Sequence, residues 1–519
     1  MSSWAKTRKL YTNWLTDTGL KCEFAKKIKI DNLSLWWATK LVDRDNINET
    51  SWYLNLDKKI NGDKIKTKNF YLTLLFLIFK LLKKLLFKII IIIFIKLFFK
   101  KKKIVGKKKS CLYSLLANFK LFDNKFVDYQ YGKFGYKNSK GKVYYIDMTE
   151  SFYLIFNYFS IKKNLKKIPL DYVIDQHNVN LIDILKIYFF VLKKLFTAIR
   201  ILKKKKYFYI NKINCENILK IRLIESFFGT MQDQLIKGCT LNKVIKNLQC
   251  TNFISYFEFY PRSRVLYYYA KEAKVKNVIS FQHGNPYDSN LSLNIKKKDY
   301  SNNNDFKFYS PKPDVICCQG EKYFKKMKSI FSSNKIYKVG SFKIELPKRY
   351  KKVTEKNNTS LKLEKNKILI ILGVSDYKGI LKLLNKCNLK NFNIFISVHP
   401  VDFSFTKNYI KNNFIHSFIL AKPNITNSFG KKDYIIFGES TLGIEMALKK
   451  FNIFRVYDKE FNPSFDVNKE ILTATTPRAI TKILKNNINN KIHLIKKDYF
   501  FKYDYRASVM FSKILDKNS

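Results

Sequence analysis

The residue types most suited to chemistry gather in one short stretch of the chain, Gly438-Glu439-Ser440-Thr441, with Glu445 shortly after it. A glycine turn followed by hydroxyl side chains that can cap a helix leaves several backbone N–H groups and the positive end of a helix dipole at one point. Such a point binds phosphate groups. Glu445 lies about one and a half helical turns beyond Ser440, where it could reach hydroxyl groups beside the phosphate. The stretch therefore predicts an anion site, although an ordinary strand–helix unit would carry a similar pattern.

The turn needs a buried strand before it, and the apolar run over residues 433–437, flanked by charge, predicts that strand. Similar runs predict further strands over residues 143–147, 172–174, 252–257, 277–281, 314–318, 336–339, 367–372, 392–398 and 452–456. Helical patterns fall between them, for example over residues 261–273 and 321–330. Strands that alternate with helices predict parallel, doubly wound sheets. We therefore expect the α/β class, with two facing Rossmann-like domains (GT-B-like) and basic amphipathic helical insertions in the N-terminal half.

A chain of 519 residues is too long for one hydrophobic core, so at least two domains are expected. Residues 345–366 are polar and rich in lysine, which predicts a linker. We expect one Rossmann-like domain over residues 1–344, a second over residues 367–498 and a C-terminal helix over residues 499–519.

Ligands of parallel α/β sheets bind at the carboxyl ends of the strands, and polar residues follow several of the predicted strands. In the second half they are Gly373, Ser375, His399, Pro400, Glu439, Ser440, Thr441 and Glu445. In the first half they are Glu258, Gln282, His283 and Gly284. Their common position at strand ends predicts that they line one cleft.

These residue types suit displacement at a sugar carbon with a nucleotide as the leaving group. Hydroxyl caps, helix N-termini and the imidazole of His399 can stabilise the charge of a departing phosphate without a metal. Glu258 or His283 can take the proton from the attacking hydroxyl, and spacing alone does not choose between them. No cofactor is expected, because the nucleotide-sugar is a substrate.

Each of these residues also has a purely structural interpretation. A histidine at a strand end, such as His399, is often only hydrogen-bonded to a neighbouring loop. Glu258 could pair with Arg262 or Arg264 in the next turn. Ser375 could act simply as a helix N-cap.

The charge balance of the chain is extreme, with 99 basic and 40 acidic residues and a formal net charge of +59. Lys, Asn, Ile, Phe and Tyr are abundant together and share A/T-rich codons, so a biased genome explains much of the lysine excess. A basic surface still favours anionic lipids or substrates. The eight cysteines form no C-x-x-C pair, which indicates a reducing compartment. The N-terminus lacks the apolar core of a signal peptide, so export is not expected.

Motifs of several other chemistries do not occur in the sequence. There is no P-loop, no G-x-G-x-x-G, no H-E-x-x-H and no G-x-S-x-G. A P-loop nucleotidase, a dinucleotide-binding enzyme, a zinc protease and a serine hydrolase are therefore unsupported.

Residues 70–103 are both strongly apolar and basic. A row of lysines at i, i+4 spacing follows one side of the predicted helix, Lys80, Lys84 and Lys88. A membrane-spanning helix would not carry such charges at its centre. We therefore expect a helix in the headgroup region of an anionic membrane surface; a soluble helical hairpin and a transmembrane span are the alternatives. Residues 181–206 have a similar basic, amphipathic pattern.

Several stretches taken together resemble a known family. They are Val278-Ile279-Ser280-Phe281-Gln282-His283-Gly284, Val398-His399-Pro400, Gly438-Glu439-Ser440-Thr441 and Glu445-Met446-Ala447-Leu448. They are similar to stretches of the two-Rossmann (GT-B) glycosyltransferases of bacterial surface polysaccharide assembly, in particular the surface carbohydrate biosynthesis proteins of capsule and O-antigen pathways. Ser34-Leu35-Trp36-Trp37 resembles the N-terminal part of those proteins. The resemblance extends over roughly residues 250–460.

The resemblance implies a nucleotide-sugar donor bound mainly by the second half. His399, Ser440 and Thr441 would contact its phosphates, and Glu445 would lie near the ribose or sugar. The loop Gln282-His283-Gly284 would line the acceptor side, and no metal would be needed. The expected protein is a glycosyltransferase that is peripheral or monotopic at the cytoplasmic face of the inner membrane. Its acceptor would be a lipid-linked glycan or a growing surface polysaccharide.

Two other functions stay open on the sequence alone. A polyol-phosphate transferase of the teichoic-acid type would share the fold and a histidine-bearing loop. A basic nucleic-acid-binding protein would need no enzyme site, but no recognition module occurs in the sequence, so no specific nucleic acid is expected.

Overall fold

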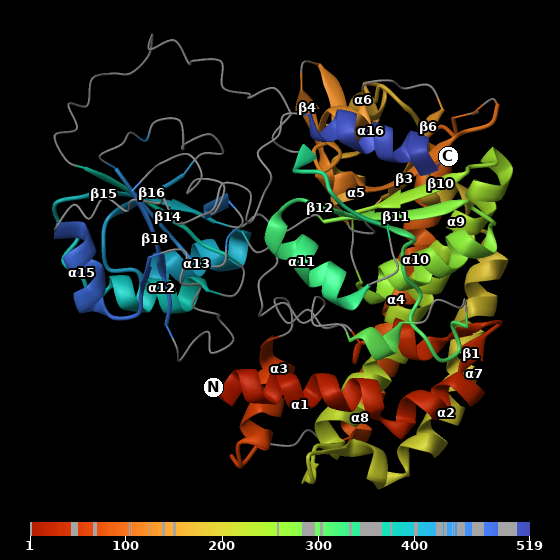
Figure 1. The fold of residues 1–519 in the computed structure, drawn as a ribbon, viewed down its shortest axis with the longest axis horizontal. Helices are drawn as coiled ribbons and strands as arrows, with labels where there is room; N and C mark the ends of the chain where they lie inside the picture. The colour runs from red at the N-terminus through yellow and green to blue at the C-terminus, as the bar shows by residue number, and fades with distance from the viewer. Residues whose placement is uncertain are drawn as a thin grey trace.

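The structure is a computed structural model. It describes residues 3–42, 50–65, 70–102, 104, 106–122, 124–136, 141–148, 152–256, 259–282, 296–300, 305–331, 335–342, 366–373, 376–398, 403–421, 429, 433–438, 440, 442–443, 452–458, 472–485 and 506–518. Two parallel sheets organise the described chain (Figure 1). The predicted linker lies almost wholly outside the described residues.

The first sheet has the strand order β13-β12-β11-β10-β3-β6-β7, and each neighbouring pair is parallel. Its strands are β3 (Ser110–Leu115), β6 (Lys142–Asp147), β7 (Asp171–Ile174), β10 (Asn252–Ser255), β11 (Asn277–Phe281), β12 (Val315–Cys318) and β13 (Lys335–Lys338). Every residue of β10, β11 and β12 is buried. Burial on both faces explains why apolar residues predominate in these strands.

Helices cover both faces of this sheet. Alternate residues of β3 and β6, such as Tyr113 and Tyr145, pack with α9 (Thr230–Leu248) and α10 (Pro261–Glu272) on one face. The residues between them, such as Tyr144, share a core with α16 (Ala507–Asn518) on the other. The C-terminal helix therefore returns to the first sheet, where Figure 1 shows it in dark blue. α11 (Glu321–Ile330) packs beside β12 and β13.

The second sheet has the order β16-β15-β14-β17-β18-β19 and is also parallel throughout. Its strands are β14 (Lys367–Ile371), β15 (Asn393–Ser397), β16 (Phe418–Leu420), β17 (Tyr434–Phe437), β18 (Asn452–Val456) and β19 (Thr473–Ala474). Its helices are α12 (Tyr377–Leu384), α13 (Phe403–Asn413) and α15 (Pro477–Lys485). The predicted α/β class with two parallel, Rossmann-like sheets is confirmed. The strands β3, β16 and β19 were not predicted.

The N-terminal region is mainly helical. Its helices are α1 (Ser3–Asp17), α2 (Gly19–Lys27) and α3 (Thr50–Ile60), and β1 (Lys29–Ile30) pairs with β2 (Leu33–Ser34). They share one core with α4 (Phe70–Phe98), α7 (Leu181–Leu202) and α8 (Glu216–Ile224). Trp36 and Trp37 lie in this core and are almost fully buried.

Smaller elements complete the described chain. They are β4 (Phe119–Phe122), β5 (Lys125–Asp128), α5 (Phe152–Phe156), α6 (Tyr158–Leu165), β8 (Tyr209–Ile210), β9 (Ile213–Asn214) and the short 3-10 turns. Among the described helices, none combines the length and the apolar content that crossing a bilayer requires.

Candidate functional site

Two glycines mark the carboxyl ends of neighbouring strands in the second sheet. Gly373 follows β14 and Gly438 follows β17, and these two strands pair in parallel. Asp376 lies between them, with 4% of its surface exposed. Its Oδ1 accepts a hydrogen bond from the Gly373 N–H at 2.7 Å. The structure thus brings the predicted strand ends at Gly373 and Gly438 together around the buried carboxylate of Asp376.

The approach of Asp376 requires a residue without a side chain at position 438. A Cβ there would lie 2.1 Å from Asp376 Oδ2, and a Cβ at position 373 would lie 3.0 Å from Oδ1. Because the Gly373 N–H is already bonded to a carboxylate, it does not face a phosphate. Asp376 Oδ2 lies against Gly438 as well, so the predicted anion is placed at the N–H groups that follow Gly438 in the chain.

A buried arginine supports that turn from the next strand. Arg455 of β18 stands opposite Phe437 in the parallel pairing of the strands. Its Nε donates a hydrogen bond to the Gly438 carbonyl at 3.1 Å, and its guanidinium lies over the Phe437 ring, 5.9 Å from the centroid. Arg455 is 2% exposed. It holds the turn and places positive charge beside the predicted anion site.

Most of the predicted site residues lie outside the described part of the chain. They are Glu258, His283, Gly284, Ser375, His399, Pro400, Glu439, Thr441 and Glu445. Ser440 is described and is partly buried, and its carbonyl accepts a hydrogen bond from the Gly443 N–H. The N-cap of α12 is Asp376, one residue after the Ser375 that the sequence suggested for this role.

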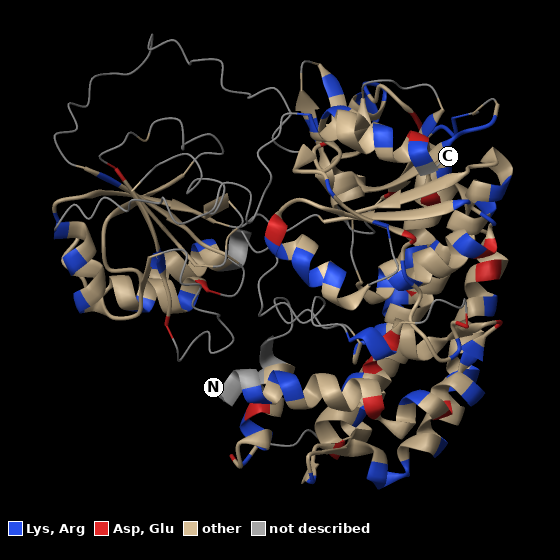
Figure 2. Cartoon of the chain, viewed as in Figure 1, with Lys and Arg blue, Asp and Glu red and all other residues tan. Residues whose placement is uncertain are grey.

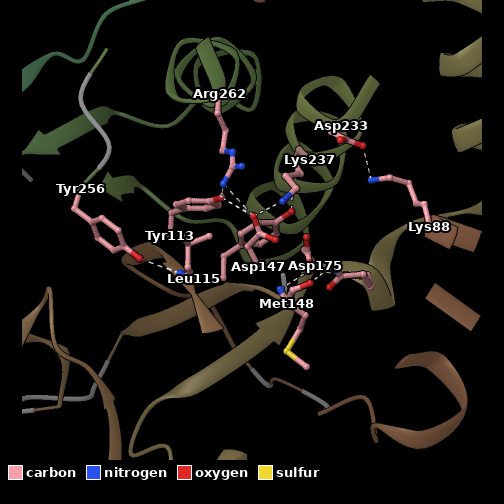
Figure 3. Close-up of polar contacts among 12 residues, drawn as sticks. Lys88, Tyr113, Leu115, Asp147, Met148, Asp175, Asp233, Lys237, Tyr256 and Arg262 are labelled. Carbon is pink, nitrogen blue, oxygen red and sulfur yellow. Dashed lines mark hydrogen bonds and ion pairs between the residues drawn. The ribbon is translucent and has the colours of Figure 1, made fainter. Parts of the chain in front are cut away.

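The first sheet also ends in a buried carboxylate. Asp147 closes β6 and is fully buried (Figure 3). Its Oδ2 accepts a hydrogen bond from the Tyr113 hydroxyl at 2.7 Å and forms an ion pair with Lys237 of α9. Arg262, at the start of α10, lies 3.6 Å from the same oxygen. Its side chain is 40% exposed, so the group reaches solvent through this arginine.

The charges of this group determine its protonation. Burial alone would raise the pKa of the Asp147 carboxyl, but Lys237 and Arg262 more than offset this and hold it below its usual value. Asp147 therefore stays ionised at neutral pH and is a weak base. Burial and the neighbouring carboxylate raise the pKa of the Tyr113 hydroxyl, which remains a hydrogen-bond donor. The group suits fixed binding and orientation better than proton transfer.

The neighbouring strand ends are tied to one another by hydrogen bonds. Asp175, directly after β7, accepts from the Met148 N–H at 3.4 Å. The Tyr256 hydroxyl, directly after β10, accepts from the Leu115 N–H at 2.9 Å (Figure 3). These bonds make the carboxyl edge of the first sheet a rigid support for the loops that follow it.

Gln282, which was predicted to line the acceptor side, forms hydrogen bonds with Gln319. Its Oε1 accepts from the Gln319 N–H at 2.8 Å, and the Gln319 side-chain amide donates to the Gln282 carbonyl at 2.6 Å. Gln282 is 1% exposed. Its amide therefore clamps β11 to β12, and any acceptor contact falls to the residues that follow it.

The arginines suggested as partners of Glu258 have other contacts. Arg262 lies beside Asp147 and Tyr113, whereas Arg264 is almost fully buried and donates from NH1 to the Val42 carbonyl at 3.2 Å.

Comparisons with known proteins find solved structures of low similarity but no matching family. No family model and no curated protein matches the chain. Among solved structures, it is similar to MnaA of S. aureus with UDP (11% identity, TM-score 0.44, 79% of this chain and 96% of that one). It is also similar to the calicheamicin glycosyltransferase CalG4 (8% identity, TM-score 0.43, 79% of this chain and 97% of that one). A third similar structure is the wall teichoic acid polymerase TagF (12% identity, TM-score 0.38, 80% of this chain and 89% of that one). Likenesses of this size assign neither activity nor substrate.

Proposed function

We propose that this chain is a glycosyltransferase that moves a sugar from a nucleotide-activated donor to a lipid-linked or growing surface polysaccharide of the capsule or O-antigen kind. It acts without a metal, at the cytoplasmic face of the inner membrane. The observation that supports the proposal is the turn that begins at Gly438, at the carboxyl end of β17. Arg455 donates a hydrogen bond to the Gly438 carbonyl and places a positive charge beside this turn. Ligands of doubly wound sheets bind at such ends.

Each half has a distinct task in the proposed reaction. In the second half, the backbone after Gly438, the Ser440 and Thr441 hydroxyls and His399 bind the donor phosphates and stabilise the negative charge as the sugar leaves. In the first half, Glu258 or His283 removes the proton of the acceptor hydroxyl. Asp147 is too weak a base for that step, and it orients Arg262 at the edge of the sheet instead.

Transfer or donor hydrolysis by purified protein tests the proposal. His399→Ala and Glu258→Gln should each lower the rate by about tenfold or more. His416→Ala is a matched control, because its Nε2 is bonded to the Leu384 carbonyl, and it should retain the rate. Full activity of both site variants would contradict the assignment.

Thermal-shift measurements with UDP-, GDP-, CMP- and dTDP-linked sugars identify the donor, since a ligand of the folded state raises the melting temperature. Stabilisation by a CDP-polyol and by no nucleotide-sugar would instead favour a polyol-phosphate transferase.

A further inference from the structure

Of the lysine row on helix α4, Lys88 is buried and Lys84 is partly buried, whereas Lys80 is exposed. Lys88 is 2% exposed, and its Nζ forms an ion pair with Asp233 Oδ1 of α9 at 2.8 Å (Figure 3). Lys84 lies one turn earlier, with its ammonium close to Gly229 at the start of α9, and burial lowers its pKa. Lys84 and Lys88 are thus directed toward α9 and away from solvent.

The side of α4 away from Lys84 and Lys88 is an exposed ridge that is apolar except for the exposed Lys83. Its members recur at three- and four-residue spacing, and they are Leu72 (67% exposed), Leu75 (53%), Phe76 (66%), Phe79 (65%), Leu82 (57%), Leu86 (62%), Ile90 (46%), Ile93 (42%) and Leu97 (73%). At 1.5 Å per residue the ridge is about 40 Å long. A monomer in water rarely exposes so large a continuous apolar surface.

Aromatic side chains extend the ridge at the carboxyl end of α4. The Tyr158 ring of α6 packs edge-on against Phe98, with centroids 5.6 Å apart, and its hydroxyl donates to the Phe98 carbonyl. Next to it, Phe156 and Phe159 are 81% and 84% exposed. Exposed aromatic rings are typical of the interface between a membrane and water.

Basic groups lie beside this apolar surface. Lys100, Lys101 and Lys102 follow α4 directly and line a cavity of about 230 Å³ together with His177 and Asn178. His177 Nε2 lies 2.8 Å from the Phe99 carbonyl, which joins the cavity to the end of α4. On α7, exposed Lys186, Lys193 and Arg200 alternate with exposed Leu185, Phe189 and Phe196.

We infer that the α4 ridge is the surface by which this protein docks on an anionic lipid bilayer. The apolar side chains of α4 enter the acyl boundary, and the lysines at its carboxyl end contact the headgroups. This inference rests on the membrane location within the proposed function, but not on the reaction.

The net charge of the chain favours an anionic bilayer over a second copy of the chain as the partner of the α4 ridge. With a net charge of +59, two copies repel each other, whereas an anionic bilayer attracts the chain. Figure 2 shows lysine and arginine spread over the helices of the N-terminal half with fewer acidic residues among them. The positive charge of the chain therefore suits contact with lipid phosphates.

Flotation of the full chain with vesicles tests the inference. Vesicles of phosphatidylcholine and phosphatidylglycerol should carry wild-type protein, and vesicles of phosphatidylcholine alone should carry less. Phe79→Glu and Leu86→Glu replace exposed side chains, so folding should persist, and each should weaken binding about tenfold. Lys100→Glu with Lys101→Glu should weaken the preference for phosphatidylglycerol.

Ile415→Glu is the matched control, because Ile415 is 73% exposed next to the second sheet. It should float as the wild type does. Equal flotation of the ridge variants and this control would overturn the inference, as would a stable dimer in the absence of lipid that Phe79→Glu dissociates. Binding of the nucleotide-sugar without vesicles is measured in parallel. If the wild-type protein did not bind any nucleotide-sugar, the proposed reaction would be contradicted. If the wild-type protein bound a nucleotide-sugar but did not float with vesicles, only the docking surface would be contradicted.

Discussion

Asp376 Oδ2 occupies the space that a side chain at position 438 would need, since a Cβ built on Gly438 falls 2.1 Å from this oxygen. The two residues come from different strand–helix units, and β14 and β17 bring them together as neighbours. The glycine is therefore required by packing against a carboxylate, in addition to any role in binding a ligand.

Gly438→Ala should destabilise the second sheet and weaken donor binding. The new methyl group must displace the Asp376 carboxylate from the Gly373 N–H, at a cost of about 1–3 kcal/mol. Urea unfolding measures the loss of stability, and calorimetry measures the donor affinity.

The Asp376→Ala background provides the control for this substitution. There the cost of Gly438→Ala should shrink, because the clashing oxygens are gone. Equal costs in both backgrounds would show that the contact does not determine the residue at position 438.

Asp147→Asn should lower stability at neutral pH and matter progressively less in acid. The folded-state pKa of Asp147 lies below its usual 3.8, so the carboxylate contributes stability above that value and loses it as the pH falls through the folded pKa. Breaking the buried ion pair with Lys237 should cost about 3–5 kcal/mol at pH 7. Urea unfolding between about pH 7 and pH 2 measures the difference from wild type.

The same series on Asp516→Asn is the comparison for Asp147, because Asp516 pairs with Lys109 at an exposed position, where its side chain is 72% accessible. That variant should differ little from wild type at any pH. A difference for Asp147→Asn that stays constant into acid would contradict the ionised state of Asp147.

Gln282→Ala should lower the melting temperature and leave the donor affinity unchanged. The substitution removes the acceptor of the buried Gln319 N–H, which costs about 1–3 kcal/mol. Scanning calorimetry and donor titration separate the two effects. A fall in transfer rate without a loss of stability would restore Gln282 to the acceptor side.

The Lys88–Asp233 pair should respond asymmetrically to neutralisation. Asp233→Asn leaves a buried ammonium beside a weaker partner, whereas Lys88→Met keeps the stem volume and leaves a carboxylate that is 35% exposed and can be hydrated. We expect Asp233→Asn to be the more destabilising by at least about 1 kcal/mol. Equal losses in urea unfolding would indicate that the Lys88 ammonium reaches solvent.

Hydrophobic pattern was sufficient to predict most of the two sheets. The predicted strand over residues 277–281 and the helix over residues 321–330 have the bounds that the structure gives them. β3 was missed although it is central, because Ser110 and Ser114 interrupt its apolar run and a polybasic stretch precedes it. Its burial comes from strands and helices that are distant in sequence.

The site was less predictable, because its buried charges depend on tertiary contacts. Asp147 stands at the end of a predicted strand, so the rule that drew attention to Gln282 could have found it. Nothing local marks Lys237 on a long helix as its partner. The lysine row of α4 was recognised, but the inward direction of Lys88 was not, since its partner Asp233 lies on another helix.

A crystal structure of the chain with its nucleotide-sugar tests the central claim most directly. The account predicts that the diphosphate lies at the turn after Gly438, within hydrogen-bond distance of the backbone N–H groups there and of the Ser440 hydroxyl. A diphosphate bound elsewhere would contradict it. One such place is the basic cavity of about 470 Å³ lined by Lys386, Arg478 and Lys482.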